Sequence, residues 1–429
     1  MTTRNFAICF VAMALFAGAA QAQQLDLSAE PEDISFGVKE YSPYLHRGYP
    51  QRVFFGDTHT HTSYSTDAGM IGCRLGPEEA YRFARGEMVV ASGGVRARLL
   101  RPLDFLVVAD HAENLGLAPM IAEANQDLLR TEFGREIFDL VQSGDYGAAY
   151  TLWGSAMSAG KDPLAGQDAL TRSMWERITE AAEKYNQPGV FTAFIGFEWT
   201  SSPGGNNLHR NVVFRDGKDD ADRVLPFSNY DSTDPEDLWR WMATYEDRTG
   251  GRMLTIPHNG NLSNGLMFDD VRLNGDPLDR AYAERRMRRE PIYEITQIKG
   301  DGEAHPLLSP DDEFADFETL DAGNISGKVA KTPEMLPKEY ARPALKEGLR
   351  LESKLGVNPF KFGLIGSSDN HTALPTTREE NNFSKASFVE PSAQRAEHAL
   401  IKGQKPELSM MVADVGAAGL AAVWARENT

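Results

Sequence analysis

The sequence predicts an α/β protein built around a closed or nearly closed barrel of about seven parallel strands. Short apolar segments rich in β-branched residues recur along the chain, and segments with a helical pattern separate them. Such alternation is typical of βα units and a parallel sheet. Histidines and carboxylates follow most of the apolar segments, and in parallel barrels the functional groups collect at the carboxyl ends of the strands.

The expected strands each have an apolar interior and end at polar residues; they cover residues 52–55, 104–109, 191–197, 209–214, 253–256, 291–296 and 362–365. A helix is expected from Pro77 to Arg85, because Pro77 suits the first turn and Glu78 and Glu79 complement the helix dipole there. Residues 115–190 are mostly helical in pattern, with glycine and serine breaks, and we expect them to form a helical insertion or cap.

Composition and charge restrict the class of partner. The chain has 429 residues, 41% hydrophobic and 25% charged, which is enough for one barrel-sized domain with extensions. Its formal net charge of -18 argues against nucleic acid or an anionic membrane as a partner. We therefore expect a small-molecule substrate. This substrate can be anionic despite the negative net charge of the protein, because net charge does not describe the charge of a single cleft.

The first residues have the pattern of a bacterial signal peptide. Arg4 supplies a positive region, residues 6–17 are apolar, and Ala20-Gln21-Ala22 fits the small-x-small cleavage rule. The apolar run is too short for a comfortable membrane span, which favours cleavage after Ala22 over an anchor. The sequence thus predicts a periplasmic or secreted protein with a signal peptide at 1–22, a polar surface segment at 23–43 and one domain at 44–429.

A group of metal-binding residue types marks the strand ends. His59 and His61 follow the first strand at i, i+2, a spacing that sends both imidazoles to one side of an extended chain. The alternative for this pair alone is two solvated loop histidines. Further candidates follow later strands: His111, Glu198, His209, His258, Lys299, His305, Asp369 and His371. Histidine with carboxylate and without cysteine suits zinc, manganese or iron(II).

These residues form motifs that resemble the polymerase and histidinol phosphatase (PHP) superfamily of metallohydrolases. The motifs are Asp57-Thr-His59-Thr-His61, Asp110-His111, Glu198 at a strand end, His258, and Asp369-Asn-His371. The intervening sequence is still more similar to the DUF3604 family, in residues 55–65, 101–105, 205–210 and 298–306. The resemblance covers residues 44–429 and implies a distorted (β/α)7 PHP-like barrel. Members of the family usually continue past Thr429, so we expect the chain to be truncated at its carboxyl end.

The resemblance implies two or three divalent ions at the mouth of the barrel. His59, His61 and Asp369 would bind the first ion, and Glu198 would bridge it to the second. His209 and His258 would complete the second site, with His305 as a competitor for the place of His209. The third ion would take His111 and His371. Asp67 stands where many relatives have another histidine, which makes the third site either doubtful or richer in oxygen.

Phosphate-ester hydrolysis is the leading functional hypothesis, because a metal pair lowers the pKa of water and polarises a phosphoryl oxygen. Arg210 could clamp phosphoryl oxygens, and Lys299 could act as a point charge; a surface ion pair is the alternative for both. Asp57 is either a weak ligand or the acceptor that orients a ligating imidazole. Two other functions stay open: an amide or lactone hydrolase of the amidohydrolase type, and a non-catalytic periplasmic protein that binds metal or ligand. Glu198 argues against the former, since amidohydrolases favour a carbamylated lysine bridge.

Overall fold

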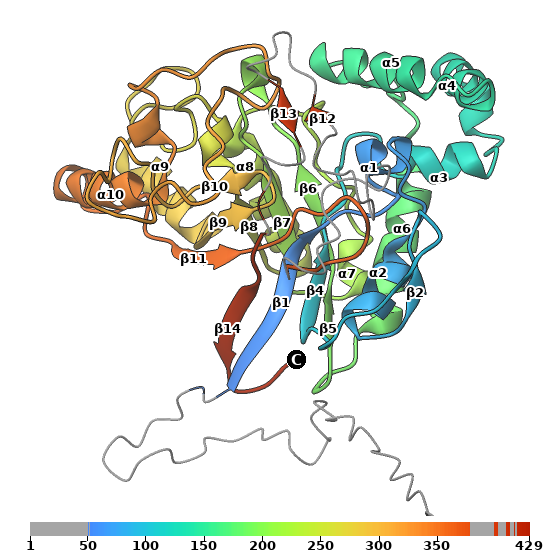
Figure 1. The fold of residues 1–429 in the computed structure, drawn as a ribbon, viewed down its shortest axis with the longest axis horizontal. Helices are drawn as coiled ribbons and strands as arrows, with labels where there is room; N and C mark the ends of the chain where they lie inside the picture. The colour runs from blue at the N-terminus through green and yellow to red at the C-terminus, as the bar shows by residue number, and fades with distance from the viewer. Residues whose placement is uncertain (1–49, 51, 378–398, 402–408, 412–415, 417) are drawn as a thin grey trace, which may run out of the picture.

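We describe a computed structural model of the chain (Figure 1). The structure describes residues 50, 52–377, 399–401, 409–411, 416 and 418–429. The expected signal peptide at 1–22 and the surface segment at 23–43 lie outside these residues. Among the described residues, no helix is both long enough and apolar enough to cross a membrane.

The first sheet begins with the strand that carries the His-x-His motif. Its order is β14 (Ala421–Ala425), β1 (Arg52–Thr60), β4 (Phe105–Val108) and β5 (Thr192–Phe194). β1, β4 and β5 are parallel, whereas β14 runs antiparallel along the outer edge of β1. The pairing of β1 with β4 contains an irregularity between Asp57 and Thr60. Bulges of this kind are common next to functional sites, where they redirect side chains.

Two further three-stranded sheets follow along the chain. The second sheet contains β6 (Gly196–Trp199), β7 (Arg210–Phe214) and β8 (Met253–Pro257), and all its neighbours are antiparallel. The third contains β10 (Gly300–Asp301), β9 (Ile292–Gln297) and β11 (Gly363–Gly366), of which β9 and β11 are parallel. Two small hairpins complete the described strands: β2 (Val89–Val90) with β3 (Arg96–Ala97), and β12 (Ala399–Ile401) with β13 (Met410–Met411).

The three main sheets meet through single residue pairs. Parallel bridges join Thr60 to Asn370, His111 to Glu198, and His258 to Glu294. A mixed α/β protein is therefore confirmed, but the described strands form separate sheets and not the expected continuous barrel of parallel strands. β7 departs most clearly from the expectation. Only ten residues separate Trp199 from Arg210, too few for the crossover that a parallel neighbour requires, so the chain turns back.

The helices lie around the sheets and at one end of the molecule (Figure 1). They are α1 (Thr66–Met70), α2 (Pro77–Ala84), α3 (Leu117–Ala122), α4 (Glu132–Gln142), α5 (Tyr146–Ser158), α6 (Asp168–Tyr185), α7 (Lys218–Ala221), α8 (Pro235–Thr249), α9 (Arg280–Arg289) and α10 (Ala341–Leu355), with short 3-10 turns η2 (Leu128–Arg130), η3 (Pro203–Gly205), η4 (Gly260–Leu262) and η5 (Leu336–Lys338). The stretch predicted as a helical insertion contains α3 to α6. The expected helix at Pro77 is α2, and Pro77 opens it.

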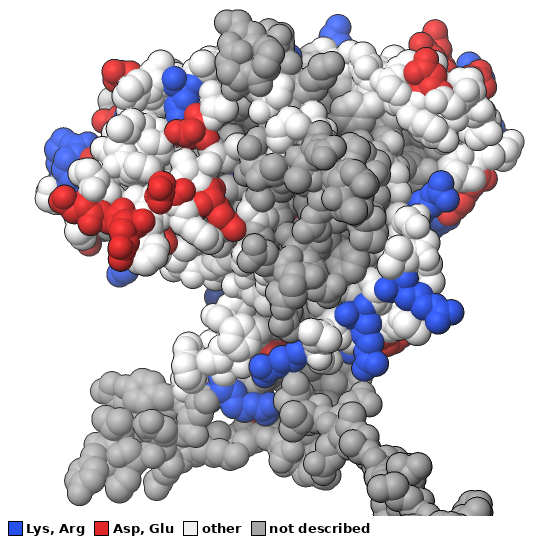
Figure 2. All heavy atoms as spheres, viewed as in Figure 1, with Lys and Arg blue, Asp and Glu red and all other residues white. Residues whose placement is uncertain are grey.

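Two large hydrophobic cores contain most of the buried apolar side chains, and two smaller clusters lie among the strands. The larger one lies between the sheets and α2, α6, α8 and α10, and it includes the buried rings of Trp175, Trp199 and Trp239. A second core joins α3, α4, α5 and the start of α6. On the face shown in Figure 2, acidic side chains gather around α10, while lysine and arginine gather toward β2 and the lower part of β1.

Candidate metal centre

The ends of the main strands bring four buried donor atoms together. The Nε2 atoms of His59 and His61 lie 3.1 Å apart. Asp369 Oδ1 lies 3.3 Å from the first and 3.2 Å from the second, and Glu198 Oε2 lies 3.4 Å and 3.2 Å from them. Ligands about 2.0–2.1 Å from a tetrahedral zinc ion are about 3.3–3.4 Å apart. Five donor–donor distances thus match the edges of one tetrahedral site.

Glu198 also faces a second group through its other oxygen. Its Oε1 atom lies 2.7 Å from His209 Nδ1 and 3.0 Å from His258 Nε2. The antiparallel return of β7 after β6 produces this contact, because it places His209 beside the end of the strand that carries Glu198. One buried carboxylate therefore lies between two histidine pairs, as a bridging ligand does.

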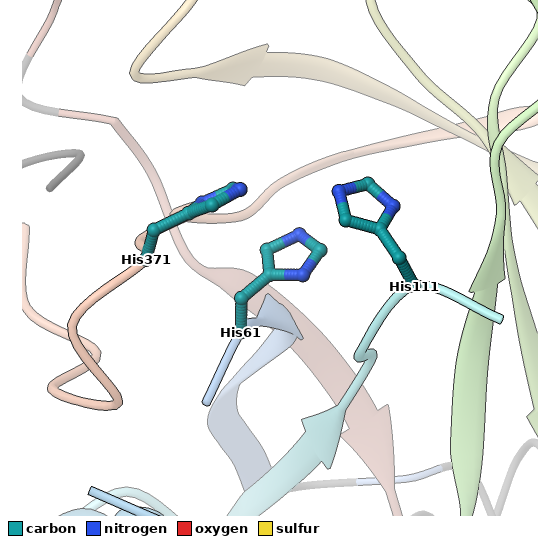
Figure 3. Close-up of side chains that lie close together, drawn as sticks. All are labelled: His61, His111 and His371. Carbon is teal, nitrogen blue, oxygen red and sulfur yellow. The ribbon is translucent and has the colours of Figure 1, made fainter. Parts of the chain in front are cut away.

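A third group contains His61, His111 and His371, whose rings approach one another from three different segments (Figure 3). Asp67, on α1, adds an oxygen: its Oδ2 atom lies 2.9 Å from His371 Nε2 and 3.4 Å from His111 Nε2. Asp67 thus supplies a carboxylate at the edge of the third group.

Sequence reasoning missed Glu294, which lies inside β9. Both of its carboxylate oxygens contact His59 Nδ1, at 3.1 and 3.2 Å, and it forms a fourth possible ligand group with His59 and His258. A carboxylate in the interior of an otherwise apolar strand was the available signal, since a buried charge requires a partner. Glu294 takes the orienting position that was one of the two roles considered for Asp57.

Asp57 instead holds two backbone segments together. Its Oδ1 atom accepts hydrogen bonds from the backbone N–H groups of His59 at 2.9 Å and Ser368 at 3.1 Å. The hydroxyls of Thr60 and Ser368 donate to its Oδ2 atom. These bonds fix the His-x-His motif against the segment that carries Asp369, so Asp57 positions the backbone of two ligands and no imidazole ring.

Two polar side chains contact Asp369: Gln297 at the end of β9, and Lys299 in the turn that follows β9. Lys299 forms a buried ion pair with Asp369 Oδ2, and Gln297 Nε2 donates to the same oxygen at 2.6 Å. Gln297 also donates to Asn259 Oδ1 at 2.6 Å. Lys299 therefore places a positive charge at the edge of the centre.

Two other candidates lie away from the donor cluster. Arg210 is buried, but its Nε atom donates to Glu290 at 2.9 Å and its guanidinium lies over the Trp199 ring. This arrangement contradicts the phosphoryl clamp expected of Arg210, because the guanidinium is committed to a buried ion pair. His305 pairs with Asp321 at 2.8 Å and belongs to none of the described donor groups, whereas His209 contacts Glu198 directly.

Burial determines the protonation state of three imidazole rings at the centre, those of His59, His209 and His258. Desolvation lowers the pKa of His209 to about 4 and lowers those of His59 and His258, although nearby carboxylates oppose the effect. These three rings are thus neutral at neutral pH and keep a lone pair for a ligand bond. Despite its burial, contacts with histidines hold the pKa of Glu198 well below its usual range, so the carboxylate is ionised.

The pKa values of three other buried groups, one histidine and two carboxyls, are raised. Burial alone would lower the pKa of His111, but Glu198 and Asp67 together raise it to about 9. Burial raises the pKa of Asp57 to about 6, and burial together with the Asp369 charge raises that of Glu294 well above its usual range. Desolvation is the main cause for Glu294, but negative charge on neighbouring buried carboxylates contributes to the shifts of both Glu294 and His111, and cations would relieve that charge.

The family model described as Protein of unknown function (DUF3604) matches residues 48–429. The chain belongs to the DUF3604 family. This match includes every residue of the candidate metal centre, and it confirms the resemblance to DUF3604 seen in the sequence motifs. Neither the curated proteins nor the solved structures contain a match to the chain.

Proposed function

We propose that this DUF3604 protein is a metal-dependent hydrolase of phosphate esters and a member of the PHP superfamily. The observation that carries the proposal is the position of Glu198, whose two oxygens face different histidine pairs. Paired divalent ions are a recurrent device of phosphate-ester hydrolysis, and a carboxylate between two donor sets suits such a pair.

The donor set fits divalent ions such as zinc, manganese or iron(II). Imidazole and carboxylate donors surround the centre, and neither thiolate nor thioether belongs to the described donor groups. Several carboxylates are buried there together, which is costly without compensating positive charge. When bound, the ions supply Lewis acidity toward the phosphoryl group and lower the pKa of water.

Residues of the chain hold the proposed metal ligands in place. Glu198 holds the two histidine pairs at a fixed separation, and Glu294 fixes the orientation of the His59 ring. Asp57 holds the backbone of His59 against the segment of Asp369. Lys299 contributes a permanent positive charge beside Asp369, which favours an anionic substrate.

We also propose that the three main sheets form one distorted seven-stranded barrel of the PHP type. The single bridges Thr60–Asn370, His111–Glu198 and His258–Glu294 link the sheets at the strand ends. With these bridges, β1, β4, β6, β7, β8, β9 and β11 follow one another around the donor cluster. The expected signal peptide adds the proposal that the enzyme acts in the periplasm or outside the cell.

Elemental analysis and a hydrolase screen test the function together. Purified protein is loaded with zinc, manganese or iron(II), its metal content is measured, and aryl phosphates, phosphodiesters, amides and lactones are offered. We expect two or three ions per chain and hydrolysis of a phosphate ester that stops when the ions are chelated. Lactone or amide hydrolysis alone would replace the phosphoesterase assignment, and bound metal without any turnover would favour a binding protein.

A further inference from the structure

A cavity of about 920 Å³ lies between α1, α3, α4 and α5, outside the donor cluster. Its lining is chiefly apolar and consists of Ser63, Gly69, Met70, Ile71, Gly72, Cys73, Arg74, Ala118, Pro119, Ile121, Ala122, Glu123, Val141, Gln142, Tyr146, Gly147 and Tyr150. Arg74 and Glu123 are the charged members of this lining. Arg177 binds the Glu123 carboxylate through two nitrogens, at 2.8 and 3.1 Å, which leaves the cavity with little free negative charge.

The cavity forms where the helical region α3–α6 meets the rest of the protein. This region has its own hydrophobic core, and the side chain of Met70 from α1 packs against it. The backbone of α1 approaches α3 very closely at Gly69: a Cβ atom there would lie 2.4 Å from the Ala118 side chain. The cavity next to this contact is lined by the end of α1 and the residues that follow it, by α3, and by residues of α4 and α5.

One short helix connects the cavity to the metal centre. Asp67, in the first turn of α1, contacts His371 and His111, and Met70 at the end of α1 lines the cavity. Three helical residues rise by about 4.5 Å. Tyr150 of α5 lines the cavity as well. The third donor group and the cavity are therefore neighbours on opposite ends of α1.

We infer that this cavity binds an aryl or branched alkyl group of an anionic substrate whose charged end lies at the metal centre. The inference rests on the proposed function for the charged end of the ligand. A cavity of this volume takes a drug-sized group and far exceeds the size of inorganic phosphate. A polar group would lose hydrogen bonds to water against such a lining, whereas each buried methylene strengthens binding about fourfold.

Gly147 lines the cavity at a position where an added side chain would meet almost no neighbouring atom at its Cβ. It lies in the first turn of α5 and lines the cavity, and a Cβ atom there would meet only Asp145 Oδ1, at 3.9 Å. Gly147→Trp should place an indole in the cavity. Gly154 provides the matched control, since it lies in the same helix, does not line the cavity and has open space around its Cβ position.

Two binding measurements test the inference without relying on turnover. Calorimetry of the zinc-loaded protein compares methylphosphonate with benzylphosphonate, and fluorescence follows 8-anilinonaphthalene-1-sulfonate on the metal-free protein. In the wild type and in Gly154→Trp, we expect benzylphosphonate to bind about tenfold or more tightly than methylphosphonate. Gly147→Trp should abolish this preference, weaken binding of the fluorescent probe about tenfold, and leave methylphosphonate unchanged.

The outcomes separate this inference from the proposed function. Equal affinity for the two phosphonates in the wild type, or an undiminished preference in Gly147→Trp, would overturn the apolar subsite even if phosphate esters are hydrolysed. A benzyl preference that Gly147→Trp removes, in a protein that hydrolyses no phosphate ester, would support the subsite and contradict the phosphoesterase. Failure of both phosphonates to bind would overturn both.

Discussion

The Nε2 atoms of His59 and His61 lie 3.1 Å apart in an interior that excludes water. Both rings also present these nitrogens to Asp369 Oδ1 and Glu198 Oε2. Two imidazole nitrogens at this separation either share one proton or bind one cation. Burial disfavours protonation of His59, which leaves its nitrogen with a lone pair, so a shared cation is the arrangement that fits this contact.

Glu198→Gln should separate the two sites that Glu198 is proposed to bridge. Glutamine keeps the size of the side chain but removes the negative charge that holds two cations close together. Outer-sphere partners of a metal are worth about 10–100-fold in affinity, so loss of a bridging ligand should cost more than about 100-fold in affinity for one ion and a comparable factor in turnover. Metal titration by calorimetry and steady-state kinetics measure the two effects.

His305→Ala is the matched control for this variant. His305 is buried and contacts Asp321, but it lies outside the donor groups, so the substitution should leave metal content unchanged. Loss of an ion in His305→Ala would transfer the second-site role from His209 to His305. Two tightly held ions with full activity in Glu198→Gln would refute the bridged pair.

Glu294→Ala should weaken metal binding through His59. The carboxylate fixes the proton of His59 on Nδ1, so that Nε2 faces the centre, and loss of such an orienting partner typically costs about 10–100-fold in metal affinity. Glu294→Gln should cost less, because an amide oxygen can still accept that proton. Asp301→Ala, which removes a half-buried carboxylate from the same sheet, is the control and should not alter metal affinity. Equal affinities in all three variants would remove Glu294 from the centre.

Metal binding at the third group should depend on pH. Glu198 and Asp67 raise the pKa of His111 to about 9, so at pH 7 the metal-free ring carries a proton that a cation must displace. Affinity of the otherwise metal-free protein for an ion at this group should therefore rise with pH up to about 9 and then level off. Elemental analysis after dialysis at several pH values should show this increase, and His111→Ala should eliminate it. A third ion bound equally well at pH 6 and pH 9 would contradict the prediction.

The fold elements predicted from sequence were those with a local cause. The expected strands appear as β1, β4, β5 with β6, β7, β8, β9 and β11, because apolar β-branched runs favour extended chain wherever they pack. The pairing of β14 with β1 joins residues 421–425 to 52–56, and no local pattern specifies that partner. The sheet order and the antiparallel return of β7 likewise depend on loops and packing.

The candidate site shows the same division between local and non-local causes. The histidines and Glu198 could be predicted because they lie near the ends of expected strands. Glu294 lies in the interior of a strand, and only the folded chain brings it into contact with His59, 235 residues away in the sequence. The role expected for Arg210 could have been doubted from sequence alone. Adjacent residues of a strand point to opposite sides, so an arrangement that turns His209 toward Glu198 turns Arg210 away from it.

Asp57 should make the metal-free protein less stable as pH rises from 4 to 6. Burial raises the pKa of its carboxyl to about 6 from the usual 3.8, so the folded state holds a proton in this range that the unfolded state releases. The folded state therefore binds more protons, and the free energy of unfolding falls as pH rises through this window. The pKa difference corresponds to about 3 kcal/mol lost above pH 6.

Asp57→Asn should remove this contribution. The amide is neutral at every pH, and its oxygen can still accept from the backbone N–H groups of His59 and Ser368. The hydroxyls of Thr60 and Ser368 can rotate to accept from the new NH2 group. In chelator, the variant should match the wild type near pH 4 and exceed it in urea resistance near pH 7. Asp127→Asn, at an exposed side chain, is the control and should follow the wild type throughout. An Asp57→Asn protein less stable than the wild type at pH 7 would show that the ionised carboxylate stabilises the fold, because the hydrogen bonds it accepts would then outweigh its desolvation.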